Sequence, residues 1–485
     1  MSAWLRRLVA TGHQRSEEDY ELLPSNSAGS PASAFNKNRR RSARSLLYAC
    51  LHLFTVRRIA VALVSIPLLM VVGVLWSGVP PSYEDIRLFE RNLPQHNVSA
   101  AVVNARTGNE PKYLRFPGHL WGHGLNNILQ EILLMSQLAY LSNRSYVFED
   151  YVWSKLPFPY TIYDFALRPT RMPINAFISG PSAGGPMSGP QAVSSEFWDS
   201  VCPKEKRRII TTEGAPPSKG TDGSVLMDWW VQRLAKVEDS CVEIEQDSLT
   251  DPIFDKYLFG GKEILSLWPG LSASPILTDF MWSPLVHSAI FRNFPILQPY
   301  SAKVLYDSST SGVLPGLVAV HLRRGDFKRH CARLAGWNSE YMGLNQFPSL
   351  PDKFDPTPYI NTTREDEKTE YYFEHCLPTT EQIVERLRKV REDHPSLSRV
   401  YLLTNGWGWW LNGLKDALRE DGWADATSSL DIQLDAAQSY VGMAVDMAIA
   451  EKAEVFVGNG FSSLSSNVVM LRMAKGLEPA SNRFL

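Results

Sequence analysis

The C-terminal half of the chain contains two short, continuously apolar runs, GLVAVHL at residues 316–322 and RVYLLTN at residues 399–405. Strands of this composition are typical of parallel sheets that helices cover on both faces. Helical spacing of apolar residues occurs between the runs, at 381–393, and again after the second run, at 436–453. Two further segments, EVFVGN and FSSLSSNVVMLRMAKG, continue the alternation as a strand and a helix. The pattern predicts an α/β domain of the Rossmann type in this half.

The N-terminal half contains a glycine-rich turn with Gly118, Gly122 and Gly124, which leads into a long amphipathic segment that starts near Asn126. The next segment, YVFED, has the composition of a strand. Such a turn can bind an anion, because backbone N–H groups and the helix dipole point the same way there. A plain helix start with no ligand is the alternative.

The longest apolar run, IAVALVSIPLLMVVGVLW at residues 59–76, carries no charge and has about the length of a bilayer-spanning helix. Several arginines precede this run, and a positive charge bias on that side predicts a cytoplasmic N-terminus. We expect a disordered cytoplasmic tail at 1–58, an uncleaved signal anchor at 59–76 and a stem at 77–111. The remainder would be lumenal, in the endoplasmic reticulum or the Golgi, as in a single-pass type II protein. A buried core helix is the alternative.

Acceptor sequons for N-glycosylation agree with this topology, because all of them follow the apolar run. They are Asn97, Asn143 and Asn361. A glycoprotein of the secretory pathway is therefore expected.

The cysteines also fit an oxidising compartment. Four of the five follow the apolar run, and Cys50 precedes it. Four cysteines allow three pairings, and pairing of nearest neighbours would close the shortest loops. Four free buried thiols are the alternative. The disulfide candidates are Cys202, Cys241, Cys331 and Cys376.

The formal net charge of −2 over 485 residues excludes a globally basic surface of the kind that binds nucleic acid. Anion recognition must therefore be local, and HLRRGDF, at the end of the first apolar run, is the best candidate. Ligands of open parallel sheets bind beyond the carboxyl ends of the strands. The planar fork of an arginine can hold two phosphate oxygens, so the stretch predicts a diphosphate site. An ion pair between Arg324 and Asp326 is the alternative.

Three motifs occur in the order GHGLNNILQEI, VAVHLRRGDF and VFVGNGFSSLSSNVV, behind the predicted anchor. In this combination the chain resembles the GDP-fucose protein O-fucosyltransferase family over residues 114–472. The resemblance implies a GT-B fold, in which two Rossmann-like domains face a cleft. It also implies GDP-fucose as donor and no metal. We place the acceptor-side domain at 112–305 and the domain that binds the GDP-sugar at 306–485.

The resemblance also implies roles for single residues. Arg323 would bind the donor diphosphate and neutralise the leaving GDP, and His321 and Asp326 would shape the nucleotide pocket. Since side chains alternate along a strand, only one of the two arginines can readily face the cleft. We expect Arg324 to pair with an acidic neighbour. The residues of the donor site are Gly124, Asn126, His321, Arg323, Asp326, Asp446, Ser462 and Ser463.

Some assignments stay open from the sequence. The register of the turn leaves Asn126 and Asn127 as alternatives, and Glu131 is a loose candidate for the base that activates the acceptor. The stretch NGWGWWLNG places three tryptophans together, at Trp407, Trp409 and Trp410. We expect them in the core or along an acceptor groove, rather than stacked on guanine.

The sequence lacks the usual metal-binding motifs, which agrees with a metal-free reaction. It has no convincing DxD motif after an apolar strand, and its histidines lack the spacing of a zinc site. The predicted function is an inverting transfer of fucose from GDP-fucose to a hydroxyl of a protein or glycan. A non-catalytic membrane-anchored binder on the same fold, or a transferase for another GDP-sugar, is the alternative.

Overall fold

The computed structural model describes residues 56–77, 80–101, 110–119, 124–154, 158–163, 166–246, 252–298, 312–325, 327–360 and 365–485. Contacts divide the chain into two compact units. One comprises residues 1–80 with 162–168, and the other comprises residues 81–161 with 169–485. Several predictions lie outside the described residues: most of the predicted tail, with Cys50, and also Asp326 and Asn361.

The predicted apolar segment forms helix α3, Val56–Ser77, with Pro67 inside it. Among the described helices, however, none meets the length and apolarity that crossing a membrane requires. The predicted membrane anchor is therefore not supported by the structure.

The N-terminal half of the larger unit is built on a five-stranded sheet in which every neighbouring pair is parallel. The predicted glycine-rich turn follows the central strand, as a Rossmann-like half requires. In spatial order the strands are β7 (Val193–Ser194), β2 (Ser145–Phe148), β1 (Tyr113–Arg115), β9 (Cys241–Glu245) and β8 (Arg208–Thr211).

The C-terminal half contains a second five-stranded sheet, also parallel throughout. Numbered along the chain, its strands lie in the order 3-2-1-4-5, which is the order of a Rossmann sheet. The prediction of a Rossmann-like sheet is confirmed for this half, and the predicted α/β class with parallel sheets is confirmed for both. In spatial order the strands are β12 (Asp425–Ser428), β11 (Arg399–Thr404), β10 (Leu314–Leu322), β13 (Ala453–Gly458) and β14 (Asn482–Phe484).

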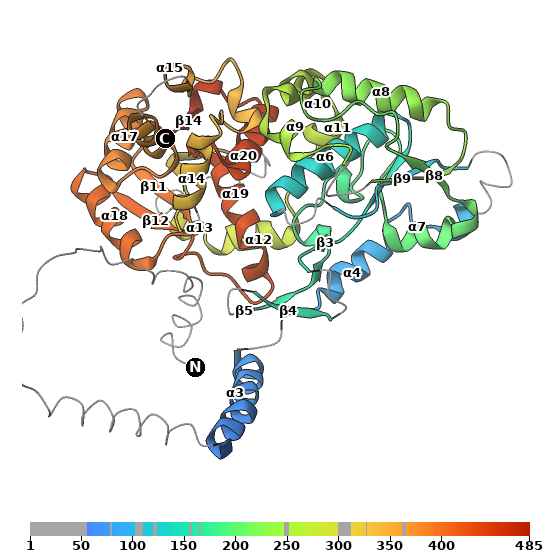
Figure 1. The fold of residues 1–485 in the computed structure, drawn as a ribbon, viewed down its shortest axis with the longest axis horizontal. Helices are drawn as coiled ribbons and strands as arrows, with labels where there is room; N and C mark the ends of the chain where they lie inside the picture. Colours follow the sequence, from blue (N-terminus) through green and yellow to red (C-terminus); the bar gives the residue numbers. More distant parts are fainter. Residues whose placement is uncertain are drawn as a thin grey trace, which may run out of the picture. The chain divides into compact units, whose positions relative to one another are not determined.

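Helices connect the strands in both halves (Figure 1). Those of the N-terminal half are α4 (Glu84–Arg91), α6 (Leu125–Leu141), α7 (Ser195–Val201), α8 (Gly223–Ala235), α9 (Lys256–Gly260), α10 (Trp268–Ser272), α11 (Pro275–Thr278), α12 (Pro284–Arg292) and α13 (Phe294–Leu297). Those of the C-terminal half are α14 (Phe327–Gly336), α15 (Thr357–Ile360), α16 (Glu365–Cys376), α17 (Thr380–Asp393), α18 (Gly408–Glu420), α19 (Gly442–Lys452) and α20 (Ser463–Ala474).

Shorter elements complete the described chain. The small strands are β3 (Tyr151–Val152), β4 (Tyr160–Tyr163), β5 (Ala166–Pro169) and β6 (Arg171–Met172). The 3-10 helices are η1 (Ile174–Ala176), η2 (Pro181–Ala183), η3 (Lys204–Lys206), η4 (Lys262–Leu267), η6 (Gly343–Gln346), η7 (Gln438–Val441) and η8 (Pro479–Ser481).

Strand β10 separates two layers of core, because its side chains alternate between the faces of the sheet. Val318, Val320 and Leu322 pack into a cluster with residues of α17 and α18. Leu317 and Ala319 belong instead to the large cluster that continues into the N-terminal half. The strand therefore has one face toward α17 and α18 and the other toward α19 and α20.

Both expected disulfides form between sequence neighbours, Cys202 with Cys241 and Cys331 with Cys376. The first joins α7 to β9, and the second joins α14 to α16. The pairing with the shortest loops, one of the three open alternatives, is the one found.

The segment placed in the predicted stem is partly folded. It contains α4, and Tyr83 and Leu93 on either side of this helix lie in the large core cluster. Asn97 and Asn143 are exposed, as N-glycosylation requires, and their modification stays a prediction.

Candidate functional site

The C-terminal sheet has its topological switch point between β10 and β13, where the strand order reverses. In sheets of this kind a ligand binds at the carboxyl ends of the strands at that point. His321 is the second-last residue of β10, and Arg323 is the first residue after the strand. The turn after β13 runs from Asn459 to Ser462 and starts α20. The fold thus brings two of the three sequence motifs together.

The two arginines after β10 turn to opposite sides, as strand alternation predicts. The Arg324 guanidinium carbon lies 4.1 Å from the Trp410 ring centroid on α18, and its Nη2 donates to the Pro378 carbonyl at 2.6 Å. The Arg324 backbone N–H donates to Asn405 Oδ1 at 2.9 Å. Burial lowers the pKa of Arg324 to about 10. Arg324 is therefore held on the α17–α18 face, and the alternative ion pair with Asp326 involves a residue outside the described ranges.

Arg323 is half-buried and lies on the other side of the strand. Its guanidinium carbon is 4.8 Å from the ring centroid of Phe327, at the start of α14. Burial and, to a lesser degree, the positive charge of Arg323 together lower the pKa of His321 to about 3. The imidazole is therefore neutral at physiological pH, and the arginine is the cation at this end of the strand.

His321 joins β10 to α20. Its Nδ1 lies 2.9 Å from Ser465 Oγ, and the same hydroxyl accepts the Asn459 backbone N–H at 3.0 Å. Ser465 was not among the predicted site residues, although it lies three positions after the predicted Ser462 and so on the same side of a helix. This contact fixes the start of α20 beside the end of β10.

The hydroxyl of Ser462 is used within the fold. Ser462 is the N-cap of α20, and its Oγ accepts the Leu464 backbone N–H at 3.3 Å. Ser463, the first residue of the helix, is partly exposed. The positive end of the α20 dipole is therefore beside β10, where it favours an anion.

The N-terminal turn reaches the same region, since α6 and α20 pack side by side (Figure 1). Gly124 is the N-cap of α6. The backbone carbonyl of Asn126 accepts from Asn467 Nδ2 at 2.8 Å, and Asn126 Nδ2 lies 3.0 Å from Met443 Sδ. One turn further on, Gln130 Nε2 donates to Ser466 Oγ at 3.1 Å. The start of α6 in one half therefore contacts α19 and α20 in the other.

Asp446 lies on α19, on the same face of the sheet as Arg323. Its Oδ1 accepts from the Tyr401 hydroxyl at 2.5 Å, and its Oδ2 accepts from Ser429 Oγ at 2.9 Å. Tyr401 is paired with Ala319 of β10. Burial raises the pKa of Asp446 to about 6, against the two hydrogen bonds, which lower it. The carboxylate is half-buried.

Glu131 lies in the second turn of α6 and is fully buried. Its Oε2 is 3.5 Å from His119 Nδ1. Burial lowers the pKa of His119, but the hydrogen bond and charge of Glu131 outweigh it, so the pKa is raised overall. The burial of Glu131 argues against direct contact with an acceptor.

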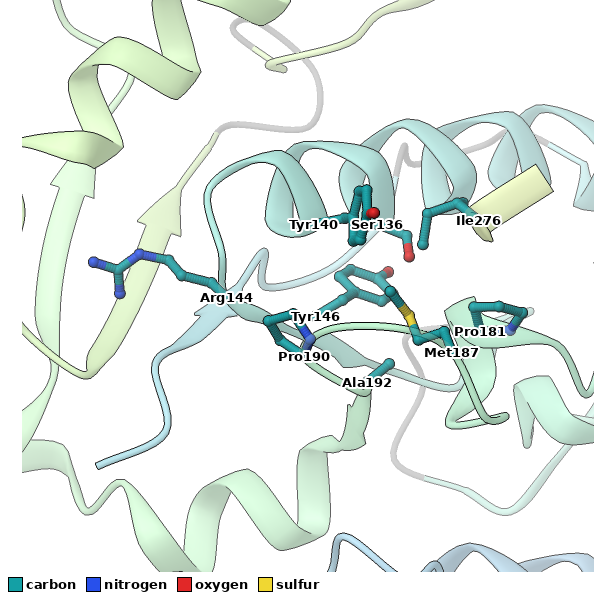
Figure 2. A pocket seen from close by; sticks show the side chains of 9 residues that line it. All are labelled: Ser136, Tyr140, Arg144, Tyr146, Pro181, Met187, Pro190, Ala192 and Ile276. Carbon is teal, nitrogen blue, oxygen red and sulfur yellow. The ribbon is translucent and has the colours of Figure 1, made fainter. Parts of the chain in front are cut away.

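Two cavities were found away from these residues. The one in Figure 2 lies under α6 and has no room for a water molecule; Tyr146, Ser136 and Met187 point into it. The other borders β8. Within the described ranges, no group of three or more His, Cys, Asp or Glu side chains could hold a metal ion.

An arginine and a helix N-terminus at the switch point of a Rossmann sheet are typical of domains that bind a nucleotide or nucleotide sugar. Residues 303–475 match the model of the GDP-fucose protein O-fucosyltransferase family. The match lies in the C-terminal half and agrees with the family that the sequence motifs resemble.

Solved fucosyltransferase structures are also similar. POFUT1 in complex with GDP has a TM-score of 0.42 and 15% identity, covering 77% of this chain and 97% of that one. NodZ alpha-1,6-fucosyltransferase soaked with GDP-fucose has a TM-score of 0.36 and 12% identity, covering 75% and 93%. A mutant of Arabidopsis thaliana FUT1 in complex with GDP has a TM-score of 0.36 and 11% identity, covering 81% of this chain and 78% of that one. No curated protein matches the chain.

Proposed function

We propose that this protein transfers fucose from GDP-fucose to a hydroxyl of a protein or glycan, with inversion at the sugar and without a metal ion. The position of Arg323 supports this most directly. It follows the central strand of the Rossmann sheet, at the switch point, within the region that matches the family. In the GT-B arrangement that we propose, the donor would lie between the two halves.

Arg323 would bind the donor diphosphate through two N–H groups at once. Negative charge on the diphosphate grows as the bond between fucose C1 and the phosphate oxygen breaks, so the guanidinium would stabilise the transition state more than the bound donor. The N-terminus of α20 lies beside it and would add backbone N–H groups and a favourable dipole. His321 stays neutral, so Arg323 carries the positive charge at this end of the strand.

The acceptor hydroxyl would attack C1 from the face opposite the departing GDP. One C–O bond forms, one breaks, GDP leaves, and the hydroxyl proton passes to a base. A single displacement of this kind inverts the anomeric configuration. The base is not assigned here to Glu131, because the side chain is fully buried.

Asp446 would recognise guanine. A charged carboxylate can accept hydrogen bonds from both N1 and N2 of the base. Each carboxylate oxygen of Asp446 already accepts a hydrogen bond from a hydroxyl, one from Tyr401 and the other from Ser429. Each oxygen has a further lone pair that can accept from the base. We propose that these hydroxyls hold the carboxylate in place for the base.

We also propose a lumenal, oxidising compartment of the secretory pathway as the place of action. Two disulfides within the folded unit support it, because disulfides persist in oxidising compartments and are rare in the cytosol. The acceptor would then be a secreted or membrane-bound protein or glycan.

Release of GDP from GDP-fucose is the experiment that tests the function. We expect the wild-type protein to release GDP, with and without a chelator, and to release more when candidate acceptors are added. The Arg323→Lys variant should release far less. Binding of GDP-fucose without release would instead indicate the non-catalytic alternative, and release from another GDP-sugar alone would change the donor. The anomeric configuration of the product, measured by NMR, tests inversion.

A further inference from the structure

Strand β8, Arg208–Thr211, is an edge strand, since within the described chain it pairs with β9 alone. A groove of about 300 Å³ borders it, lined by all four of its residues and by Arg233 and Val237 at the end of α8. Successive side chains of a strand point to opposite faces. A groove that touches four consecutive residues therefore runs along the edge of the sheet, where the outward backbone N–H and C=O groups of the strand lie.

Within the described residues, the central part of this edge is open to solvent on one face. Ile209 is 53% exposed, while Ile210 is 7% exposed and packs inward. An edge with free backbone groups is a template for another strand, and proteins commonly protect it with charged side chains. Of the residues that line the groove, the charged ones are Arg208 and Arg233, so they repel a basic strand and attract an acidic one.

Arg233 is a fixed part of the groove. Its guanidinium carbon lies 5.1 Å from the Trp229 ring centroid and 5.9 Å from that of the buried Trp230. Its Nη1 donates to the Glu213 backbone carbonyl at 3.2 Å, and its Nη2 donates to the Thr211 backbone carbonyl at 3.5 Å, so Arg233 is tied to the C-terminal end of β8. These contacts are to rings and carbonyls, so they orient the cation without neutralising it.

Arg208 places a second guanidinium at the start of the strand, and it is exposed. Lys204 and Lys206 precede it in η3, and Lys236 follows α8; all three are exposed. Glu205, Glu213 and Glu238 also belong to these segments. Among the ion pairs of the described residues, none neutralises Arg208, Arg233 or these lysines. The paired arginine of the segment is Arg207, which contacts Asp199 and Glu243.

We propose that this edge binds an extended acidic segment of a partner polypeptide, which adds to the sheet as a sixth strand beside β8. Main-chain hydrogen bonds would give the affinity, in the manner of strand addition to other exposed sheet edges. Arg208 and Arg233 would select carboxylates near the two ends of the groove, roughly 10 Å apart given the rise of a four-residue strand. The proposal rests on the geometry of this edge and is independent of the transferase reaction.

An anionic glycan is the competing occupant, because it too would be attracted by these cations. A glycan needs only the charges, whereas a polypeptide strand also needs the free backbone edge. The observation that the groove follows four consecutive strand residues favours the polypeptide.

The test uses the full chain and three fluorescent hexapeptides: alternating Val-Glu, the same sequence with alternate backbone N-methyl groups, and alternating Val-Lys. We expect only the first to bind in fluorescence anisotropy. Arg208→Glu should weaken this binding by about tenfold or more, since it turns an attraction into a repulsion. Lys262→Glu, an equal charge change at an exposed lysine of η4, away from the groove, is the matched control and should change binding less than twofold. Thermal unfolding should be the same for both variants.

Three outcomes overturn the proposal. The first is no binding of the Val-Glu peptide to the wild-type chain. The second is equal binding of its N-methylated form, which shows that the backbone edge is not used. The third is binding of a sulfated oligosaccharide that depends on Arg208 while the peptide does not bind, which assigns the groove to a glycan. GDP release by Arg208→Glu should equal that of the wild type, so a failed proposal here leaves the transferase test unaffected.

Discussion

The guanidinium of Arg324 stacks on the indole of Trp410, 4.1 Å from the ring centroid, while the adjacent Arg323 turns to the other face of the sheet. Two neighbouring cations thus have different surroundings. Arg324 joins the strand end to α18 and to the segment before α17, and Arg323 stays beside the N-terminus of α20. The difference allows catalysis and stability to be separated by experiment.

Arg323→Lys should remove most of the activity at unchanged stability. Lysine keeps the charge but loses the two-pronged geometry, and losing one preorganised donor typically costs about 3–4 kcal/mol in the transition state. We expect the turnover number for GDP release to fall by roughly two to three orders of magnitude, with a smaller change in GDP affinity.

Arg324→Lys is the matched variant. It should lower the free energy of unfolding by roughly 1 kcal/mol, because the stacking on Trp410 and the bond to Pro378 are lost, and it should keep most of the turnover. Steady-state kinetics and urea unfolding on both variants decide the matter. An inactive Arg324→Lys beside a normal Arg323→Lys would show that the roles are reversed.

Replacement of Trp409 and of Trp410, two of the three neighbouring tryptophans, should also affect different properties. Trp409 is 74% exposed in the first turn of α18, whereas Trp410 is covered by Arg324. Trp409→Ala should leave unfolding and donor hydrolysis unchanged and raise the KM for acceptor several-fold, if this side chain borders the acceptor. Trp410→Ala should lower stability. Equal acceptor KM values for Trp409→Ala and wild type would remove Trp409 from the acceptor site.

Asp446 should give the protein a characteristic pH dependence. Its pKa is raised from 3.8 to about 6 in the folded state, so the folded protein holds this proton more tightly than the unfolded chain. Its contribution to the free energy of unfolding is therefore greatest below about pH 4 and declines as the pH rises to about 6, by at most about 3 kcal/mol. Asp446→Asn should lack this decline. Urea unfolding of both proteins from pH 4 to 7.5 measures the difference, and parallel curves would contradict it.

Donor binding should change in the opposite direction over the same pH window. Only the charged carboxylate can accept from both guanine nitrogens, so GDP affinity of the wild type should rise from pH 5 to pH 7. The Asn variant should bind weakly at both values. Calorimetric titration with GDP is the measurement, and guanosine serves as a control without the diphosphate. A wild-type affinity that is flat with pH would argue against guanine recognition by Asp446.

The disulfides give a prediction about stability. Non-reducing peptide mapping should recover Cys202 with Cys241 and Cys331 with Cys376. Replacing both Cys331 and Cys376 by alanine should lower the free energy of unfolding by about 2–4 kcal/mol, since the unfolded chain regains the freedom of a 45-residue loop. Four free thiols in the native protein would refute the pairing.

Much of the second half followed from local sequence patterns. The apolar run at 316–322 is β10, the run at 399–405 is β11, and the helical spacing between them is α17, because burial on both faces and a period of 3.6 are properties of a short segment. Strand alternation alone also placed Arg323 and Arg324 on opposite faces. The extra length at the start of β10 depends on Gly316, whose φ of +74° suits glycine and coincides with a shift in the pairing with β13.

Tertiary packing decided what no short segment contains. The bond between Gln130 and Ser466 joins residues 336 positions apart and forms only when α6 and α20 pack together. This contact, with that of Asn126 and Asn467, also shows that Asn126 reaches the second half. Which cysteines pair, that Glu131 is buried beside His119, and that β8 is left at an open edge all depend on the order of strands in the sheets. The sequence by itself determines which face of a strand a side chain lies on, because this depends only on the backbone of that short segment. The residue that the side chain contacts is decided by tertiary structure, because it lies on an element that is distant in the sequence.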